Sequence, residues 1–315
     1  MRKSFTEQVA STLEALQKAR CCRLTGFVLA PRIAPMAIDN ALRALDIDLP
    51  ACPQTLVQLS LLMHDEDANL QSIGGLIETD MALASAVVRT VNSALFGLLR
   101  RVESVPEAVR YLGTREVAGL TFEIGLRGAF PPSPLLTALW ARAGRRGLAM
   151  GRAAPSLDID PWLAHTAGLF AESGQAALVG HDAPGYEALV ATTPNPLVQL
   201  EAEAVTYGLN HAALGGALCQ AWGLAGDVAA SVRLRPMALR TLVAPEGDDF
   251  AAPWLTEPLS VQRLLALGAA VDAALEGQGE DMLARASATL GPLAGLDAAL
   301  LHEAVAASVA RLGDA

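Results

Sequence analysis

Histidine and carboxylate side chains are the groups in this chain that could hold a metal ion and activate water on a phosphoester. That chemistry needs several of them close together, and no HExxH pair occurs. His181 and Asp182 are adjacent, but Ala-Pro-Gly follows them and indicates a turn. We therefore predict no catalytic residues, no metal ligands and no cofactor. The histidines, all well separated, are residues 64, 165, 181, 211 and 302.

Arginine side chains form the main basic run of the sequence. At helical spacing, residues 142, 145 and 146 share one face. Such a charged stripe is either a solvated face or a docking face for an acidic partner or a phosphate-bearing ligand such as a cyclic dinucleotide. Both interpretations stay open at this point. The candidate partner or ligand face consists of Arg142, Arg145, Arg146 and Arg152.

The helices that must position these side chains are clearest between residues 76 and 113. Asp80 is a good N-cap, and apolar residues four apart follow it until Gly97, which predicts a helix of about four turns. Residues 104–107 read Ser-Val-Pro-Glu, a capping box with proline in the first turn. Gly113 ends that second helix. The stretch predicts two helices joined by a turn.

The same stretch carries a family resemblance. Residues 92–97 read Asn-Ser-Ala-Leu-Phe-Gly, and residues 208–224 carry the pattern G-x-x-H-x-x-x-G-x-x-L-x-x-x-W-G-L. Together with the Leu-Ile-Glu-x-Asp run at residues 76–80, they resemble the HDOD domain, an all-helical bacterial signalling module related to the HD metal-dependent phosphohydrolases. Met81 replaces the proline of the family pattern. The signature residues, which we expect to be mainly structural, are Asn92, Ser93, Phe96, Gly97, His211 and Trp222.

The resemblance also locates the positions at which HD enzymes hold their metal. The family's Leu-Leu-His-Asp-Ile-Gly motif falls on residues 169–174, where Ala171 and Glu172 replace the histidine and aspartate. An upstream histidine, expected two residues after a tryptophan, falls on Arg142. Alanine offers no ligand atom and a cation repels a divalent ion. The resemblance therefore implies a scaffold that has lost its metal ligands at Arg142, Ala171 and Glu172.

Composition supports a soluble helical protein. The chain has 315 residues, of which 52% are hydrophobic and only 4% aromatic, so we expect a core of Leu, Ala and Val in packed helices. A net charge of −10 argues against nucleic acid or an anionic membrane as a partner. Neither a secretory signal nor an apolar run of membrane-spanning length is evident, and the cysteines form no CxxC pair. We predict a cytoplasmic protein that does not insert into membranes.

The expected fold is all-α, an HD-domain-like multi-helix bundle with helical extensions at both ends. Residues 1–48 form an N-terminal helical extension and residues 49–243 the HDOD-like domain. A segment rich in proline and acidic residues then acts as a linker, and residues 259–315 form a C-terminal helical segment. These last helices either build a small subdomain or dock on the main body.

These expectations lead to three function hypotheses. The first is a non-enzymatic protein of bacterial signal transduction that regulates other proteins by binding them. The second is a sensor that holds a cyclic dinucleotide or another phosphorylated ligand against the arginine face. The third is a divergent metal-dependent phosphohydrolase with a relocated site. The sequence names neither the partner nor the oligomeric state.

Overall fold

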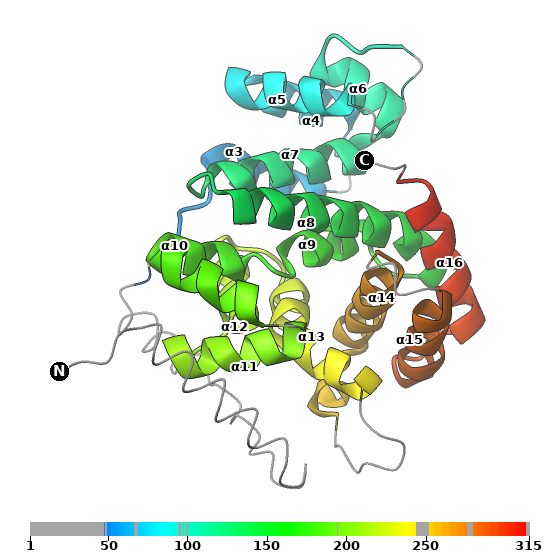
Figure 1. Ribbon diagram of the computed structural model, residues 1–315. Helices are drawn as coiled ribbons and strands as arrows, with labels where there is room; N and C mark the ends of the chain where they lie inside the picture. The colour runs from blue at the N-terminus through cyan, green and yellow to red at the C-terminus, as the bar shows by residue number, and fades with distance from the viewer. Residues whose placement is uncertain are drawn as a thin grey trace, which may run out of the picture.

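The computed structural model describes residues 47, 49–65, 69–93, 96, 98, 100–193, 195–243, 252–275 and 280–312. Over these ranges the regular secondary structure is helical throughout, which confirms the predicted all-α class (Figure 1). The helical extension predicted for residues 1–48 lies outside the described residues, apart from the buried Ile47. None of the described helices combines the length and the apolarity needed to cross a bilayer.

Three short helices form the layer at the top of Figure 1: α4 (Leu70–Glu78), α5 (Met81–Val91) and α6 (Val105–Leu112). They pack on α3 (Gln54–Met63) and α7 (Thr114–Gly128). The cluster of buried apolar residues that holds this layer continues into the rest of the molecule. The layer therefore belongs to the same hydrophobic core as the helices below it.

The predicted helix after Asp80 starts as expected but is shorter than predicted. It ends at Val91 after 11 residues, about three turns, and not near Gly97. Asn92 follows, and its side-chain amide donates to the carbonyl of Val102 while its side-chain oxygen accepts from the N–H of Val102, both at 2.9 Å. The chain leaves the helix here because Asn92 pairs with the returning loop.

The second helix of the pair begins and ends where the sequence predicts. The hydroxyl of Ser104 accepts from the backbone N–H of Glu107 at 3.3 Å. The Glu107 carboxylate reaches back to the N–H of Glu103 at 2.8 Å and not to that of Ser104, so the reciprocal bond of the capping box is shifted by one residue. Gly113, with φ 87°, ends the helix in a conformation that favours glycine.

Longer helices form the centre of the molecule, and the two that pack most closely on each other are α8 and α9. Helix α10 is kinked at Asp182, whose side chain accepts from the N–H of Gly185 at 3.1 Å, so the predicted turn appears as a kink. The central helices are α8 (Pro134–Ala153), α9 (Pro161–Phe170), α10 (Gly174–Thr192), α11 (Pro196–Tyr207), α12 (His211–Ala221) and α13 (Gly226–Val243).

The C-terminal helices α14 (Leu259–Leu275), α15 (Glu280–Leu293) and α16 (Ala298–Ala310) dock on the main body. Helix α14 packs on α8, α9 and α13, and α16 packs on α8. Just before them, Trp254 is fully buried and its indole N–H donates to the hydroxyl of Thr241 at 3.1 Å. Of the two arrangements left open by the sequence, the structure shows the docked one.

Candidate functional site

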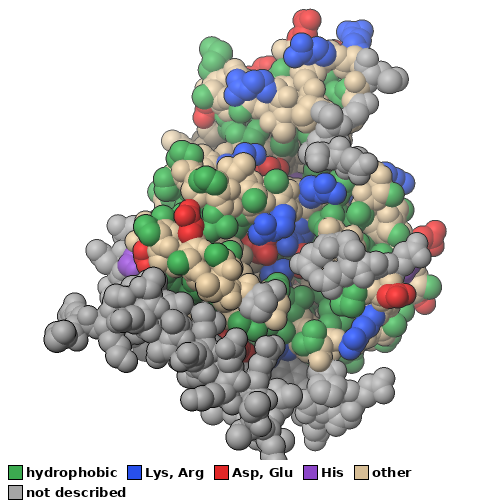
Figure 2. All heavy atoms as spheres, in the orientation of Figure 1, with side chains coloured by type: hydrophobic (Ala, Val, Ile, Leu, Met, Phe, Trp, Pro, Cys, Tyr) green, Lys and Arg blue, Asp and Glu red, His purple; other side chains and the backbone are tan. Residues whose placement is uncertain are grey.

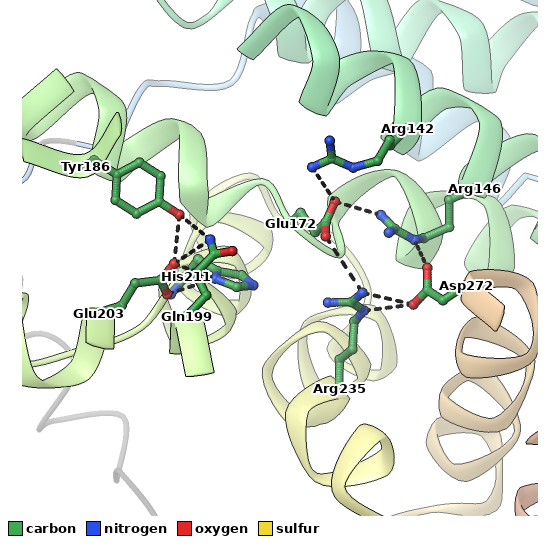
Figure 3. A network of polar contacts seen from close by, with 9 residues as sticks. All are labelled: Arg142, Arg146, Glu172, Tyr186, Gln199, Glu203, His211, Arg235 and Asp272. Carbon is green, nitrogen blue, oxygen red and sulfur yellow. Dashed lines mark hydrogen bonds and ion pairs between the residues drawn. The ribbon is translucent and has the colours of Figure 1, made fainter. Parts of the chain in front are cut away.

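The positions that correspond to the HD metal ligands lie together in the fold. Arg142 is on α8, and Ala171 and Glu172 form the turn between α9 and α10. The Arg142 Nη2 atom lies 3.6 Å from Glu172 Oε2, and the two side chains point toward each other (Figure 3). Glu172 is buried, whereas the Arg142 side chain is 51% exposed. The structure therefore places an ion pair between two of the positions that the sequence comparison predicts to be altered metal ligands.

Close backbone packing holds this turn in place. A Cβ atom on Gly174 would lie 2.0 Å from the carbonyl oxygen of His211 and 2.6 Å from the backbone nitrogen of Gly215, so only glycine fits. Gly174 is the last residue of the motif at 169–174, while His211 and Gly215 belong to the pattern at 208–224. The motif residues thus bring the turn that carries Glu172 against the start of α12.

Glu172 is approached by three guanidinium groups. Arg146 on α8 donates to its Oε2 atom at 3.3 Å, and Arg142 shares that oxygen. Arg235, from α13, lies 3.8 Å from its Oε1 atom. Both oxygens of this buried carboxylate therefore face cations.

A second carboxylate, from the C-terminal helix α14, completes the group. Asp272 Oδ2 accepts from Nε and Nη2 of Arg235 at 3.1 and 2.9 Å, and Oδ1 accepts from Nε of Arg146. Asp272 is 4% exposed, so these hydrogen bonds are shielded from solvent. We call the five side chains the arginine–carboxylate cluster: Arg142, Arg146, Glu172, Arg235 and Asp272.

Electrostatics inside the cluster keeps Glu172 and Arg146 charged. Burial alone would raise the pKa of Glu172, but Arg146, Arg235 and Arg142 outweigh it and hold that pKa well below its usual range. Burial likewise would lower the pKa of Arg146, but Asp272 and Glu172 hold it above its usual value. Glu172 and Arg146 are therefore ionised throughout the neutral range.

This donor set does not suit a divalent metal. Ala171 has no ligand atom, and Glu172 directs its oxygens at guanidinium groups. In the part of the chain that the structure describes, no three His, Cys, Asp or Glu side chains come together as metal ligands. The positive charge that a metal would supply beside Glu172 comes from arginine.

The predicted arginine face is not a single exposed stripe. Arg142 and Arg146 lie one turn apart on the side of α8 that faces Glu172, but only Arg146 is buried, where it also meets Asp272 of α14. Arg152 is held by Glu116 through two hydrogen bonds of 2.7 and 3.1 Å. Arg145 is partly exposed, and Arg142 is the member of the set that is both exposed and in contact with the cluster.

A second buried network lies beside the cluster, around Glu203. Tyr186 donates to Glu203 Oε1 at 2.7 Å, and the Gln199 amide donates to it at 3.0 Å (Figure 3). Burial alone would raise the pKa of Glu203, but His211 holds it below its usual value. The ionised carboxylate only accepts hydrogen bonds, so the His211 Nδ1 atom, 2.8 Å from Oε2, carries a proton.

The other signature residues have packing contacts. The indole N–H of Trp222 donates to the carbonyl of Pro50 at 2.8 Å, and its ring meets Phe170 edge to face with centroids 5.6 Å apart. Phe96 is partly buried against the core, and Ser93 is exposed. Gly97 lies outside the described residues. These contacts tie the domain's entry segment to its last helices.

Sequence reasoning missed Arg235, Asp272 and Glu203, which lie far along the chain from the motif they contact. One signal was present for Asp272, because it is the only charged residue in the apolar run from Leu264 to Leu275. A lone charge on an otherwise apolar helix indicates a buried partner. The sequence pattern does not identify the partner. Only the packing of α14 on α8 and α13 identifies Arg146 and Arg235 as the partners of Asp272.

A further histidine was also missed. His165 on α9 is buried, and its Nε2 atom has no hydrogen-bond partner among the described residues. It is enclosed by Gly119, Gly147 and Gly151, where added Cβ atoms would lie 2.3, 3.4 and 3.2 Å from its side chain. Burial lowers its pKa to about 4, so the imidazole is neutral. Its surroundings are those of a packed core residue.

Similarity to known proteins agrees with this geometry. An uncharacterized protein of Treponema pallidum (strain Nichols) is 28% identical over 200 residues, which are 59% of this chain and 37% of that protein. The crystal structure of an HDOD domain protein from Geobacter sulfurreducens has a TM-score of 0.62 and 18% identity, over 87% of this chain and 95% of that chain.

Another crystal structure, of a candidate signal transduction protein from Marinobacter aquaeolei VT8, has a TM-score of 0.62 and 21% identity. The matched region covers 96% of the present chain and 64% of the Marinobacter chain. At these identities the likeness to solved structures shows the fold. The HDOD domain model matches residues 49–235, more than half of the sequence. With its helical fold and both family motifs in contact, the chain belongs to the HDOD domain family.

Proposed function

We propose that this protein is a non-enzymatic regulator in bacterial signal transduction that acts by binding other proteins. The observation that carries the proposal is the contact between Arg142, Arg146 and Glu172 at the place of the HD metal ligands. Guanidinium groups around an ionised carboxylate repel a divalent cation, and a guanidinium cannot activate water as a metal does. The scaffold is left with its surfaces as the means of action.

A metal and turnover measurement tests the non-enzymatic part. The full chain is purified without chelators, its transition-metal content is measured, and hydrolysis of a phosphodiester is followed with and without added Mn²⁺. We expect substoichiometric metal and no turnover above the rate without protein. Stoichiometric metal together with turnover would establish the divergent phosphohydrolase instead.

A reconstitution experiment tests the protein-binding part. Proteins cross-linked to the tagged full chain in its native cell are identified, then purified separately and mixed with it. We expect at least one to form a complex of defined stoichiometry with a saturable binding isotherm. If no candidate binds when purified, the protein-interaction proposal fails, whatever the outcome of the metal measurement.

A further inference from the structure

The arginine–carboxylate cluster is not balanced in charge. Three guanidinium groups face two carboxylates, so the cluster carries one unit of positive charge in excess. Asp272 is fully engaged by Arg146 and Arg235. Among the described residues Arg142 pairs with Glu172 alone, at 3.6 Å, beyond hydrogen-bond distance. The excess charge is therefore centred on Arg142.

That excess charge lies on the side of the cluster that is open to solvent. The Arg142 side chain is 51% exposed, while those of Arg146 and Arg235 are 5% and 10% exposed. Basic side chains gather around a recess near the centre of the face shown in Figure 2, with acidic side chains among them. Solutes can reach the cluster from this side.

A cavity of about 20 Å³ adjoins the cluster, lined by Arg146, Arg235 and Asp272 together with Met150, Leu264 and Gly268. A volume of that size holds about one water molecule and no larger ion. An anion larger than water does not fit this cavity, so Arg142, the most exposed arginine of the cluster, is where an anion can make contact.

We propose that the solvent-exposed side of the arginine–carboxylate cluster binds a phosphate group of a small molecule, with Arg142 as the main contact. Guanidinium groups match the oxygen geometry of phosphate and form paired hydrogen bonds with it. The whole chain carries a net charge of −10, but charges farther than about 8 Å are screened at physiological salt. The excess positive charge at Arg142 therefore decides whether phosphate binds. The negative charge of Glu172 limits the affinity.

The test follows thermal unfolding of the full chain in sodium phosphate against sodium chloride at matched ionic strength and pH. We expect phosphate to raise Tm by roughly 2–5 °C with saturation in the millimolar range. Arg142→Gln should weaken the phosphate effect about tenfold. Arg89→Gln, which removes an equally charged and exposed side chain on α5, is the matched control and should keep the full effect.

A second variant separates binding from general stabilisation. Glu172→Gln raises the charge excess from one unit to two, so phosphate should bind more tightly and raise Tm more than in the unchanged protein. Isothermal titration of the unchanged protein with inorganic phosphate provides a measurement that needs no variant. Absence of saturable heat, or an equal Tm response in the Arg142 and Arg89 variants, would overturn the proposal.

The source of the phosphate group is distinguished by the probe. Inorganic phosphate, a phosphomonoester and a cyclic dinucleotide are titrated in parallel. Tighter binding of a cyclic dinucleotide than of inorganic phosphate would assign the recess to a phosphodiester signal. Binding of inorganic phosphate with no gain from either ester would restrict the proposal to the free ion. No binding of any of the three would reject it.

Discussion

Arg146 of α8 and Asp272 of α14 are 126 residues apart in the chain and form a buried hydrogen-bonded ion pair. Asp272 also neutralises Arg235 of α13. Two buried guanidinium groups in the family-matched region thus depend on a carboxylate that lies beyond residue 235, where the match ends. The C-terminal helices are part of what keeps the domain folded.

Replacing Asp272 with Asn should be strongly destabilising. The amide keeps the shape but leaves Arg142, Arg146 and Arg235 to share the single negative charge of Glu172 in the interior, a loss of about 3–5 kcal/mol. Urea unfolding followed by circular dichroism measures it. Asp158→Asn is the control, because that carboxylate is fully exposed beside Arg263 and should give no measurable change. Equal stability of the two variants would contradict the role given to Asp272.

A chain that ends at residue 243 should not fold cooperatively. It lacks Asp272 and also Trp254, a fully buried side chain that fills part of the core next to Thr241. We expect helical far-ultraviolet dichroism with weak near-ultraviolet signal and a broad thermal transition. A sharp transition within a few degrees of the full chain would show that residues 49–243 stand alone.

Removing His165 should flatten the pH dependence of stability. Its pKa of about 4 in the folded protein is below the ordinary 6.5, so the unfolded chain binds the extra proton between these values. The stability it contributes is complete above pH 6.5 and is lost as pH falls toward 4, in total roughly 3 kcal/mol. Urea unfolding of the protein and of His165→Asn at several pH values measures the difference.

Glu123 changes the free energy of unfolding in the opposite direction over part of the same pH range. Burial raises its pKa from 4.5 to about 7, so its contribution is lost as pH rises through that range. The comparison must therefore be made between the protein and the His165 variant, in which the Glu123 effect cancels. Parallel curves for the two would show that His165 is not held neutral by burial.

Gly119 and Gly128, both on α7, should respond oppositely to alanine. At Gly119 the new Cβ would lie 2.3 Å from the His165 ring, which Gly147 and Gly151 prevent from moving, so a loss of about 1–3 kcal/mol is expected. At Gly128 no atom lies within 4 Å, and alanine should stabilise by about 0.5 kcal/mol through backbone entropy. Thermal unfolding of both variants checks the sign, and a gain at Gly119 would contradict the packing described.

Tyr186→Phe should cost about 1.5–3 kcal/mol, because its hydroxyl donates to the buried carboxylate of Glu203 at 2.7 Å. Tyr111→Phe removes the same hydroxyl from a side chain that is 53% exposed and should leave stability unchanged. The two free energies of unfolding are measured in urea. Equal effects would mean that the Glu203 network contributes nothing specific.

The sequence by itself determined the helical class, the starts of the paired helices and the family. Capping residues such as Asp80 and Ser104 act on backbone groups within one turn, so their effect can be read locally. It also located the altered ligand positions at Arg142, Ala171 and Glu172. Local pattern failed at Asn92, where the helix ends because a side chain pairs with a loop ten residues ahead.

Tertiary structure decided which side chains surround Glu172. From the sequence, residues 142, 145 and 146 formed one charged face with an open purpose. Packing buried Arg146 and set Arg235 and Asp272 beside it, from helices about 90 and 126 residues farther along. Charge pairing in the interior depends on which helices meet, and no local pattern encodes that. The sequence predicted altered ligand positions, and only the packing of α8, α13 and α14 showed the arginines and carboxylates that meet there.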